Sequence, residues 1–453
     1  MKEAMRVLVV SYTFPPVGGV GVQRVLKLVK YLPRCGVTPS VLTARGASVP
    51  LLDPALEREV PAGVEILRAR TLEPAYSTKE LAWRANGDAS RSLKSRSLAA
   101  ATRLARRLLV PDPQVLWLPA AAGALARRLA SRRADDVVFI SGPPFSPFLL
   151  ALLARLRPGT GVVLDYRDEW TTTSTMYEMS ASPTAAKLLE QRLCAKAHAI
   201  TTATDEFRSA LLLRFPFLPA DRVVTIPNGY DPEDFPSDLP SPPVDRFVLA
   251  YVGTVYRMTS ARGFLAGLRL FHERSPELAR SLETRFVGRI VATEEPYFEG
   301  SEALGVRRVG YVGHRRAIEE LAGSHAAMCL LPDLEGNSRI YPAKFFEIMR
   351  LGRPCLALAP PGALANLVRR CRAGEVVAPD DAAGIAELLQ RWVRRFLSDP
   401  HARPSGPVDI ERFDRREQAR AFASVFRTAL ADARDRRVLV NEPSRDPEER
   451  NAS

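Results

Sequence analysis

Two charged residues, Lys344 and Glu347, stand at the start of a helical pattern that follows Pro342. Proline suits the first turn of a helix because it has no N–H group to leave unpaired, and the free N–H groups of that turn attract anions. Lys344 adds a positive charge there, and Glu347 lies about one turn further along a neighbouring part of the same face. A carboxylate at that distance from a bound phosphate can accept both hydroxyls of a ribose, at about 1.5 to 3 kcal/mol per charged hydrogen bond. The pattern predicts a nucleotide site.

The alternative is an exposed ion pair, worth about 0.2 to 0.5 kcal/mol, on a helix that only packs. Lys344 is the only lysine after residue 196, in a chain whose basic residues are mostly arginine. This retention of lysine favours the nucleotide site.

A second phosphate-binding pattern is the glycine-rich loop with Gly18 and Gly19, between a predicted strand at 6–11 and a helix at 23–32. Backbone N–H groups at such a helix start favour a negative ligand. The dinucleotide fingerprint G-x-G-x-x-G is not met, because Arg24 stands where its third glycine belongs. The alternative is a tight turn that needs glycine dihedral angles and binds nothing.

These loops belong to two predicted series of short apolar strands alternating with helices, which indicates parallel sheets covered on both faces. We predict an α/β protein with two Rossmann-like, doubly wound parallel-sheet domains. The predicted segments are a domain at 1–230, a proline-rich linker at 231–246, a domain at 247–408, an amphipathic helix at 409–434 and a disordered tail at 435–453.

Composition limits the function classes. The chain has 453 residues, with 46% hydrophobic and 25% charged residues and a formal net charge of +13, which is ordinary for a globular protein and favours anionic partners. The five cysteines are scattered without a Cys-x-x-Cys pair, so neither a disulfide framework nor a structural zinc site is indicated. No apolar run reaches the roughly 18 residues of a membrane-spanning helix. We expect a cytoplasmic protein whose membrane contact, if any, is peripheral to the inner face of the cytoplasmic membrane.

Six segments together resemble glycosyltransferase family 4, a family of GT-B enzymes, and its bacterial cell-surface polysaccharide branch in particular. They are SYTFPPVGGVGVQR (11–24), LDYRDEW (164–170), IPNGYD (226–231), YVGTVYR (251–257), GYVGH (310–314) and YPAKFFEIMRLGRPCLAL (341–358). The resemblance spans about residues 6–430. It implies the GT-B fold, with a C-terminal helix that returns toward the N-terminal domain, and transfer of a sugar from a nucleotide-diphosphate donor to a hydroxyl acceptor.

The resemblance also assigns roles to single residues. Gly18 and Gly19 would approach the donor diphosphate, Lys344 and either Arg257 or Arg262 would neutralise it, and Glu347 would hold the ribose. Gly313 and His314 would lie near the base; Gly253, Tyr341 and Pro342 complete the expected donor site. The family's first glutamate is replaced by Arg339, and Asp333 or Glu335 in the nearby loop could substitute for it. Thr254 stands where many members carry an arginine.

Catalysis is expected without a metal or cofactor, the nucleotide sugar being a co-substrate. No Asp-x-Asp triplet occurs, so Lys344, an arginine and helix N–H groups would stabilise the leaving diphosphate. The family's chemistry retains the anomeric configuration. The first 197 residues contain no histidine, so we expect Asp168, just past a strand end, to orient the acceptor hydroxyl with Arg167 as an anion contact. The alternative is a loop ion pair between Asp168 and an arginine.

Residues 84–107 combine seven basic residues with a single acidic one, and leucines and an alanine recur there at helical spacing. This segment could lie on an anionic membrane and give access to a lipid-linked acceptor; a basic, solvated helix is the alternative. The sequence leaves three other functions open. A GT-B nucleotide-sugar epimerase or hydrolase would need no acceptor, a dehydrogenase would need the glycine that Arg24 replaces, and a nucleic-acid-binding protein would need clustered basic and aromatic residues.

Overall fold

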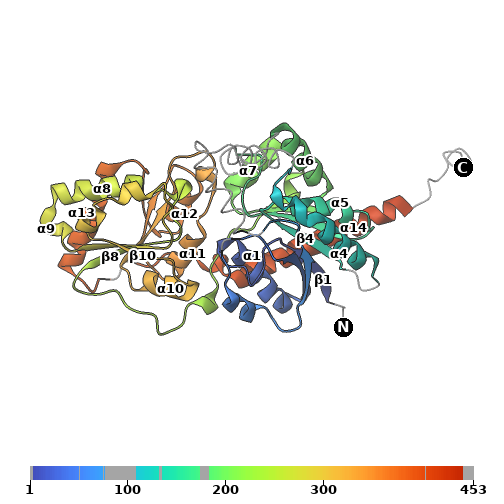
Figure 1. Cartoon of the computed structure of the whole chain (residues 1–453), viewed down its shortest axis with the longest axis horizontal. Helices are drawn as coiled ribbons and strands as arrows, with labels where there is room; N and C mark the ends of the chain where they lie inside the picture. The colour runs from blue at the N-terminus through green and yellow to red at the C-terminus, as the bar shows by residue number, and fades with distance from the viewer. Residues whose placement is uncertain are drawn as a thin grey trace, which may run out of the picture. The chain divides into compact units, whose positions relative to one another are not determined.

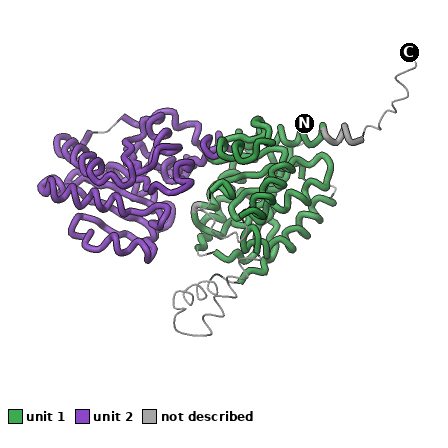
Figure 2. The backbone as a smooth tube through the Cα atoms, turned by 90° about the horizontal axis from the view of Figure 1, so that it is seen from above, with its two compact units in different colours: residues 1–203, 208–226, 419–453 green, residues 204–207, 227–418 purple. Residues whose placement is uncertain are grey.

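The computed structural model describes residues 4–49, 51–74, 76, 109–131, 135–173, 183–402 and 405–441. The chain divides into two compact units (Figure 2). The first comprises residues 1–203, 208–226 and 419–453, and the second comprises residues 204–207 and 227–418. The predicted membrane segment at 84–107 lies outside the described residues. None of the described helices has the length and apolar composition that crossing a bilayer requires.

The first unit is built on a seven-stranded parallel sheet in the order β3-β2-β1-β4-β5-β6-β7. Its strands are β1 (Met5–Val10), β2 (Val37–Arg45), β3 (Glu65–Arg70), β4 (Val137–Gly142), β5 (Gly161–Tyr166), β6 (Ala199–Thr202) and β7 (Val223–Thr225). The helices are α1 (Val20–Tyr31), α4 (Leu118–Ala130), α5 (Leu150–Ala154), α6 (Pro183–Lys196) and most of α7 (Asp205–Arg214) and α14 (Arg415–Asn441).

The core of the first unit joins the beginning of the chain to its end. One hydrophobic cluster combines residues of β1 and α1 with residues 419–430 of α14. Within it, the ring of Phe139 on β4 meets Phe422 and Phe426 edge-on, with ring centroids 5.4 and 5.3 Å apart. The C-terminal helix therefore returns to the N-terminal domain, as the resemblance implied.

The second unit contains a six-stranded parallel sheet in the order β10-β9-β8-β11-β12-β13. The strands are β8 (Phe247–Val252), β9 (Leu282–Val287), β10 (Val306–Gly310), β11 (Ala326–Leu330), β12 (Cys355–Leu358) and β13 (Gly374–Val377). The helices are α8 (Arg262–Arg274), α9 (Pro276–Ala279), α10 (His314–Ala322), α11 (Ala343–Arg350), α12 (Ala363–Arg370) and α13 (Ala382–Ser398). α8 and α13 lie on one face of the sheet and α10 on the other (Figure 1).

Side chains of this sheet alternate between two cores, as the period of a strand requires. Leu249 and Tyr251 of β8 belong to the core with α8 and α13, whereas Ala250 belongs to the core with α11 and α12. A strand buried on both faces reads as a continuous apolar run. The prediction of two doubly wound parallel-sheet domains is confirmed.

Several boundaries differ from the expected ones, including the start of the C-terminal helix, which is Arg415 and not residue 409. Residues 231–246, expected as a linker, lie within the second unit. The backbone of Tyr230 bonds to Phe413 O and to Arg415 N, at 3.0 Å each, which ties the start of this segment to the end of the same unit. Helix α14 continues to Asn441, beyond its expected end at 434.

Candidate active site

The site in the second unit lies where the sheet changes direction. β8 and β11 are neighbours, but the chain proceeds from β8 to β9 and from β11 to β12, on opposite sides. The connections after these two strands therefore diverge, and open α/β sheets bind ligands in the crevice that such divergence leaves. Gly253 directly follows β8, and the connection after β11 leads to α11, which carries Lys344 and Glu347.

Lys344 and Gly253 come together at this point. The Nζ atom of Lys344 lies 3.8 Å from the centroid of the Tyr251 ring, a cation–π contact that places the ammonium group beside the end of β8. Gly253 has φ of +134°, and a Cβ built on it would lie 2.5 Å from Lys344 Nζ. The backbone angle favours glycine, and a larger residue here would also displace the lysine amino group.

Glu347 meets His314, the first residue of α10. The Nε2 atom of His314 lies 2.9 Å from Glu347 Oε1, and its Nδ1 lies 4.0 Å from Asp234 Oδ2. The side chains of His314, Glu347 and Asp234 are 29, 22 and 17% exposed, so the group is partly open to solvent. The resemblance placed His314 near the base; the structure brings it to the carboxylate expected to hold the ribose.

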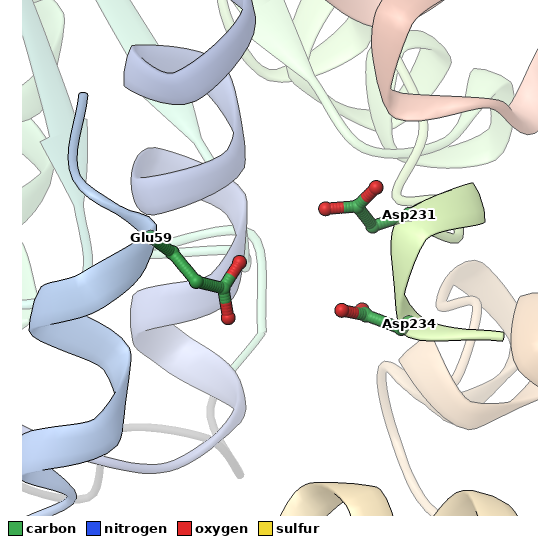
Figure 3. A group of neighbouring side chains, drawn as sticks. All are labelled: Glu59, Asp231 and Asp234. Atoms are coloured by element: carbon green, nitrogen blue, oxygen red, sulfur yellow. The ribbon is translucent and has the colours of Figure 1, made fainter. Parts of the chain in front are cut away.

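Asp234 comes from the segment expected as a linker. It ends the short 3-10 helix η6 (Pro232–Asp234), whose preceding residue, Asp231, accepts a hydrogen bond from Glu233 N at 3.1 Å (Figure 3). Its proximity to His314 could not be read from the sequence, because 80 positions separate the two residues. Figure 3 also draws Glu59 of the first unit, whose carboxylate accepts from Lys27 Nζ at 2.6 Å.

The approach to α11 differs slightly from the expectation. Pro342 is the residue before the helix, with φ of −58° and ψ of 128°, and the helix begins at Ala343. Tyr341 is half-buried and packs edge-on against Phe346, with centroids 6.1 Å apart. Burial raises the pKa of Tyr341 to about 12, so its hydroxyl is protonated and able to donate at neutral pH.

The loop between β11 and α11 contains Arg339, which stands at the position of the family's first glutamate. Arg339 ends the 3-10 helix η10 (Asn337–Arg339), and its carbonyl accepts from Thr204 Oγ1 at 2.5 Å. Asp333 and Glu335, the possible substitutes, are exposed. Sequence reasoning missed Asn337, which is buried and donates from Nδ2 to the carbonyls of Pro332 at 2.8 Å and Met258 at 3.3 Å. It ties this loop to the connection after β8.

The remaining residues of the expected donor site occupy loop and helix ends. Gly313 precedes α10, Arg257 begins the 3-10 helix η7 (Arg257–Thr259), and Arg262 begins α8. Both arginine side chains are exposed. Both therefore remain candidates for contact with a diphosphate.

In the first unit, Arg24 belongs to a buried network of hydrogen bonds. It is buried and donates to Asp165 Oδ1 and to Ile226 O, at 2.8 Å each. Ser141 and Thr201 also donate to Asp165, at 2.7 Å each. Burial opposes the charged form, but Arg24 and these hydroxyls outweigh it and lower the pKa of Asp165. The residue at the third-glycine position is thus a buried cation, and it distinguishes this loop from a dinucleotide-binding turn.

The other expected residues of the first unit surround the ends of β1, β4 and β5. Gly19 precedes α1 with φ of +94° and open space at its Cβ position, and Gly18 N donates to Leu51 O at 3.1 Å. Arg167, expected to contact an anion, directs its guanidinium to the carbonyls of Gly21, Gly142 and Pro143. This arginine holds loops together.

Asp168 lies just past β5, as expected, and its side chain is partly exposed at the surface. Removal of water from around the carboxyl group raises the pKa of Asp168, and the positive charge of Arg167 opposes that rise. A carboxyl group with this environment can exchange a hydrogen bond with a substrate hydroxyl.

Solved structures share this architecture over almost the whole chain. Sucrose-phosphate synthase from Thermosynechococcus elongatus has a TM-score of 0.57 at 17% identity, covering 96% of this chain and 99% of that one. HepE of Anabaena, solved with UDP and glucose, has a TM-score of 0.53 at 14% identity, with coverages of 96% and 99%. TarM of S. aureus, solved with UDP, fondaparinux and α-GlcNAc-glycerol, has a TM-score of 0.56 at 9% identity, with coverages of 97% and 100%. At these identities the likeness shows the fold.

The sequence itself matches a family model. Residues 18–229 match the glycosyl transferase 4-like domain. Residues 18–229 therefore resemble a glycosyl transferase 4-like domain, and the chain as a whole has the GT-B fold. The matched residues include the glycine-rich loop, the Arg24–Asp165 pair and Asp168, and they end close to the start of the second unit at residue 227. No curated protein sequence matches the chain.

Proposed function

We propose that the chain is a retaining, metal-independent glycosyltransferase that binds a nucleotide-diphosphate sugar in its second unit and transfers the sugar to a hydroxyl acceptor. The observation that carries this proposal is the placement of Lys344 and Glu347 one helical turn apart on α11, with Lys344 against Gly253 and Glu347 against His314. A cation and a carboxylate at the switch point of a parallel sheet match the two ends of a nucleoside diphosphate.

Lys344 provides a positive charge beside the diphosphate, on which negative charge develops during the transfer. In the transfer, the bond between the anomeric carbon and the diphosphate oxygen breaks while a bond from the acceptor oxygen to that carbon forms. The departing phosphate takes the acceptor proton on the same face, so the configuration is retained and no dedicated base is needed. Lys344 and Arg257 or Arg262 stabilise the leaving diphosphate electrostatically. The lack of an Asp-x-Asp triplet in the sequence supports transfer without a metal.

The acceptor would be bound by the first unit, where Asp168 orients its hydroxyl. We propose a lipid-linked acceptor in bacterial polysaccharide or glycoconjugate synthesis, which would bring the enzyme to the inner face of the cytoplasmic membrane through residues 84–107. The support is the basic composition of that segment. Sedimentation with liposomes tests this part, and equal partitioning onto neutral and acidic liposomes would count against it.

A thermal-shift panel of UDP, GDP, ADP and TDP tests the donor site. HepE and TarM were solved with UDP, which makes UDP the first nucleotide to measure. A ligand at about 100 times its Kd stabilises the folded protein by about 2.7 kcal/mol. Stabilisation by none of the four would contradict the proposal. Turnover of the matching nucleotide sugar in EDTA, with the anomeric configuration read by NMR, tests the mechanism; consumption without any acceptor would indicate an epimerase or hydrolase.

A further inference from the structure

We propose that His314 and Asp234 are positioning residues that hold Glu347 so that the site selects ribose over 2′-deoxyribose. This inference rests on the nucleotide site proposed above. Neither residue is assigned a contact with the nucleotide. Both act through the carboxylate of Glu347.

The hydrogen bond between His314 and Glu347 fixes one carboxylate oxygen. His314 Nε2 and Glu347 Oε1 are 2.9 Å apart, and because a carboxylate can only accept, the proton lies on Nε2. One oxygen of Glu347 is thus engaged by the protein, and the other is presented in a set direction. A carboxylate held in this way accepts from a ligand hydroxyl with little loss of side-chain freedom.

Asp234 lies beside the other ring nitrogen of His314. The imidazole belongs to the first residue of α10. The carboxylates of Glu347 at 2.9 Å and Asp234 at 4.0 Å face it from two other elements, α11 and η6. The ring thus lies between two carboxylates, which keeps Nε2 directed at Glu347.

The element that carries Asp234 is itself anchored to α11. Phe235, the next residue, meets the ring of Tyr230 edge-on at 6.2 Å. The guanidinium of Arg350, three positions after Glu347, lies 5.6 Å from the Phe235 ring centroid and 5.8 Å from that of Tyr230. η6 and α11 are therefore joined once through these rings and once through His314, so Asp234 and Glu347 are held at a fixed spacing.

A carboxylate with a fixed direction discriminates strongly between ligands. A nucleotide that lacks one ribose hydroxyl leaves the presented oxygen without its partner, and a desolvated group left unpaired is costly. A loosely held Glu347 could turn to other donors and would lose this discrimination. The ratio of the Kd of 2′-deoxy-UDP to the Kd of UDP therefore reports on positioning, whereas general damage to the site weakens both ligands alike.

The test measures both dissociation constants by calorimetry in the full chain and in five variants: Glu347→Gln, His314→Asn, Asp234→Asn, the double variant Asp234→Asn/His314→Asn, and the control Asp238→Asn, which removes an exposed carboxylate further along the same segment. GDP and its 2′-deoxy form replace the UDP pair if GDP is the nucleotide that binds. The wild-type ratio is expected on the order of ten or more. It should fall about ten-fold in His314→Asn and about two- to five-fold in Asp234→Asn.

The double variant should match His314→Asn alone, because Asp234 acts through the histidine. Additive effects of the two substitutions would show that Asp234 does not act through His314 and would indicate a direct contact of Asp234 with the ligand. Variants that weaken both nucleotides equally, or leave both unchanged, would overturn the inference while the proposed function stands. Failure of the wild-type protein to bind any nucleoside diphosphate would overturn the proposed function and this inference with it.

A second measurement does not depend on a ligand. The chain has five histidines, so the imidazole nitrogen signals of His314 can be assigned by comparison with His314→Asn. These signals should move in both Glu347→Gln and Asp234→Asn and stay in place in Asp238→Asn. Signals that stay unchanged in both variants would show that these two residues do not position His314, even if nucleotides bind.

Discussion

The two sheets place an acid–base pair near their carboxyl ends but surround it differently. In the first unit, Arg24 and Asp165 are 2 and 0% exposed, and two hydroxyls and a backbone carbonyl complete their hydrogen bonds. In the second unit, His314 and Glu347 are 29 and 22% exposed. A buried pair with complete hydrogen bonding has no capacity left for a ligand, whereas a partly open pair can bind one. Exposure separates the buried structural pair from the pair that we propose binds a ligand.

The glycines that follow the first strand of each sheet show the same contrast. Gly19 and Gly253 both have positive φ, at +94° and +134°. The Cβ position of Gly19 faces open space, whereas that of Gly253 would meet Lys344 Nζ at 2.5 Å. The first glycine meets a backbone requirement next to open space, and the second also makes room for a charged side chain.

The largest expected effect is on the stability of the first unit. Arg24→Ala leaves Asp165 buried without its cation, which typically costs about 3 to 5 kcal/mol. Urea unfolding followed by circular dichroism measures it. The double variant Arg24→Met/Asp165→Leu should recover part of the loss, because it removes the unpaired buried charge but leaves Ser141, Thr201 and the carbonyl of Ile226 without these partners. In contrast, Glu347→Gln should change stability by less than about 1 kcal/mol. Equal losses at the two pairs would contradict the comparison.

Substitution of Lys344 should act on turnover and leave folding intact. Lys344→Ala is expected to lower kcat by on the order of 10² or more, since it removes a charge that stabilises the leaving diphosphate. Steady-state kinetics with the donor found in the nucleotide panel give the value, and the unfolding midpoint serves as the control. Unchanged turnover would exclude Lys344 from the mechanism.

The glycine pair gives a smaller, matched test. Gly19→Ala and Gly253→Ala should each cost about 1 kcal/mol or more in stability from backbone strain. Only Gly253→Ala should also weaken nucleotide binding, because its methyl group displaces Lys344 from the Tyr251 ring. Thermal unfolding with and without nucleotide separates the two effects. Equal loss of nucleotide binding in both variants would show that the crowding at Gly253 is unimportant.

A pH-dependent effect concerns a buried acid of the first unit, Glu190, whose burial outweighs the charge of nearby Arg214. Glu190 accepts from Thr171 N at 3.3 Å, and burial raises the pKa of Glu190 from 4.5 to about 7. The folded state therefore binds this proton more tightly than the unfolded state, so its contribution to stability is present below about pH 4.5 and is lost as pH rises to about 7.

Glu190→Gln should remove this dependence. The variant is expected to match the wild-type protein near pH 4.5 and to be more stable above pH 7, by on the order of 1 to 3 kcal/mol. Melting temperatures of the two proteins across this range provide the measurement. A constant difference at every pH would show that Glu190 does not titrate in the folded protein.

The sequence predicted the sheets and the loops that carry the site, because continuous apolar runs, glycines and the proline before α11 are local signals. It could not predict partners that are distant in the chain. Arg24 and Asp165 are 141 positions apart in the chain, and His314 and Glu347 are 33 positions apart. The contacts of Arg167 with backbone carbonyls were likewise not predicted. An arginine contacts a ligand or the protein backbone depending on which loops fold next to it. Composition and motif spacing do not reveal which loops these are.

The central claim is that the donor nucleotide is bound by the second unit through Lys344, and calorimetric titration of the stabilising nucleoside diphosphate tests it most directly. Lys344→Ala should raise the Kd about ten-fold or more, as expected for loss of a charged contact. Asp168→Asn, the matched substitution in the first unit, should leave the Kd within about two-fold of the wild-type value, because Asp168 serves the acceptor. A Kd raised by Asp168→Asn and unchanged in Lys344→Ala would contradict the account.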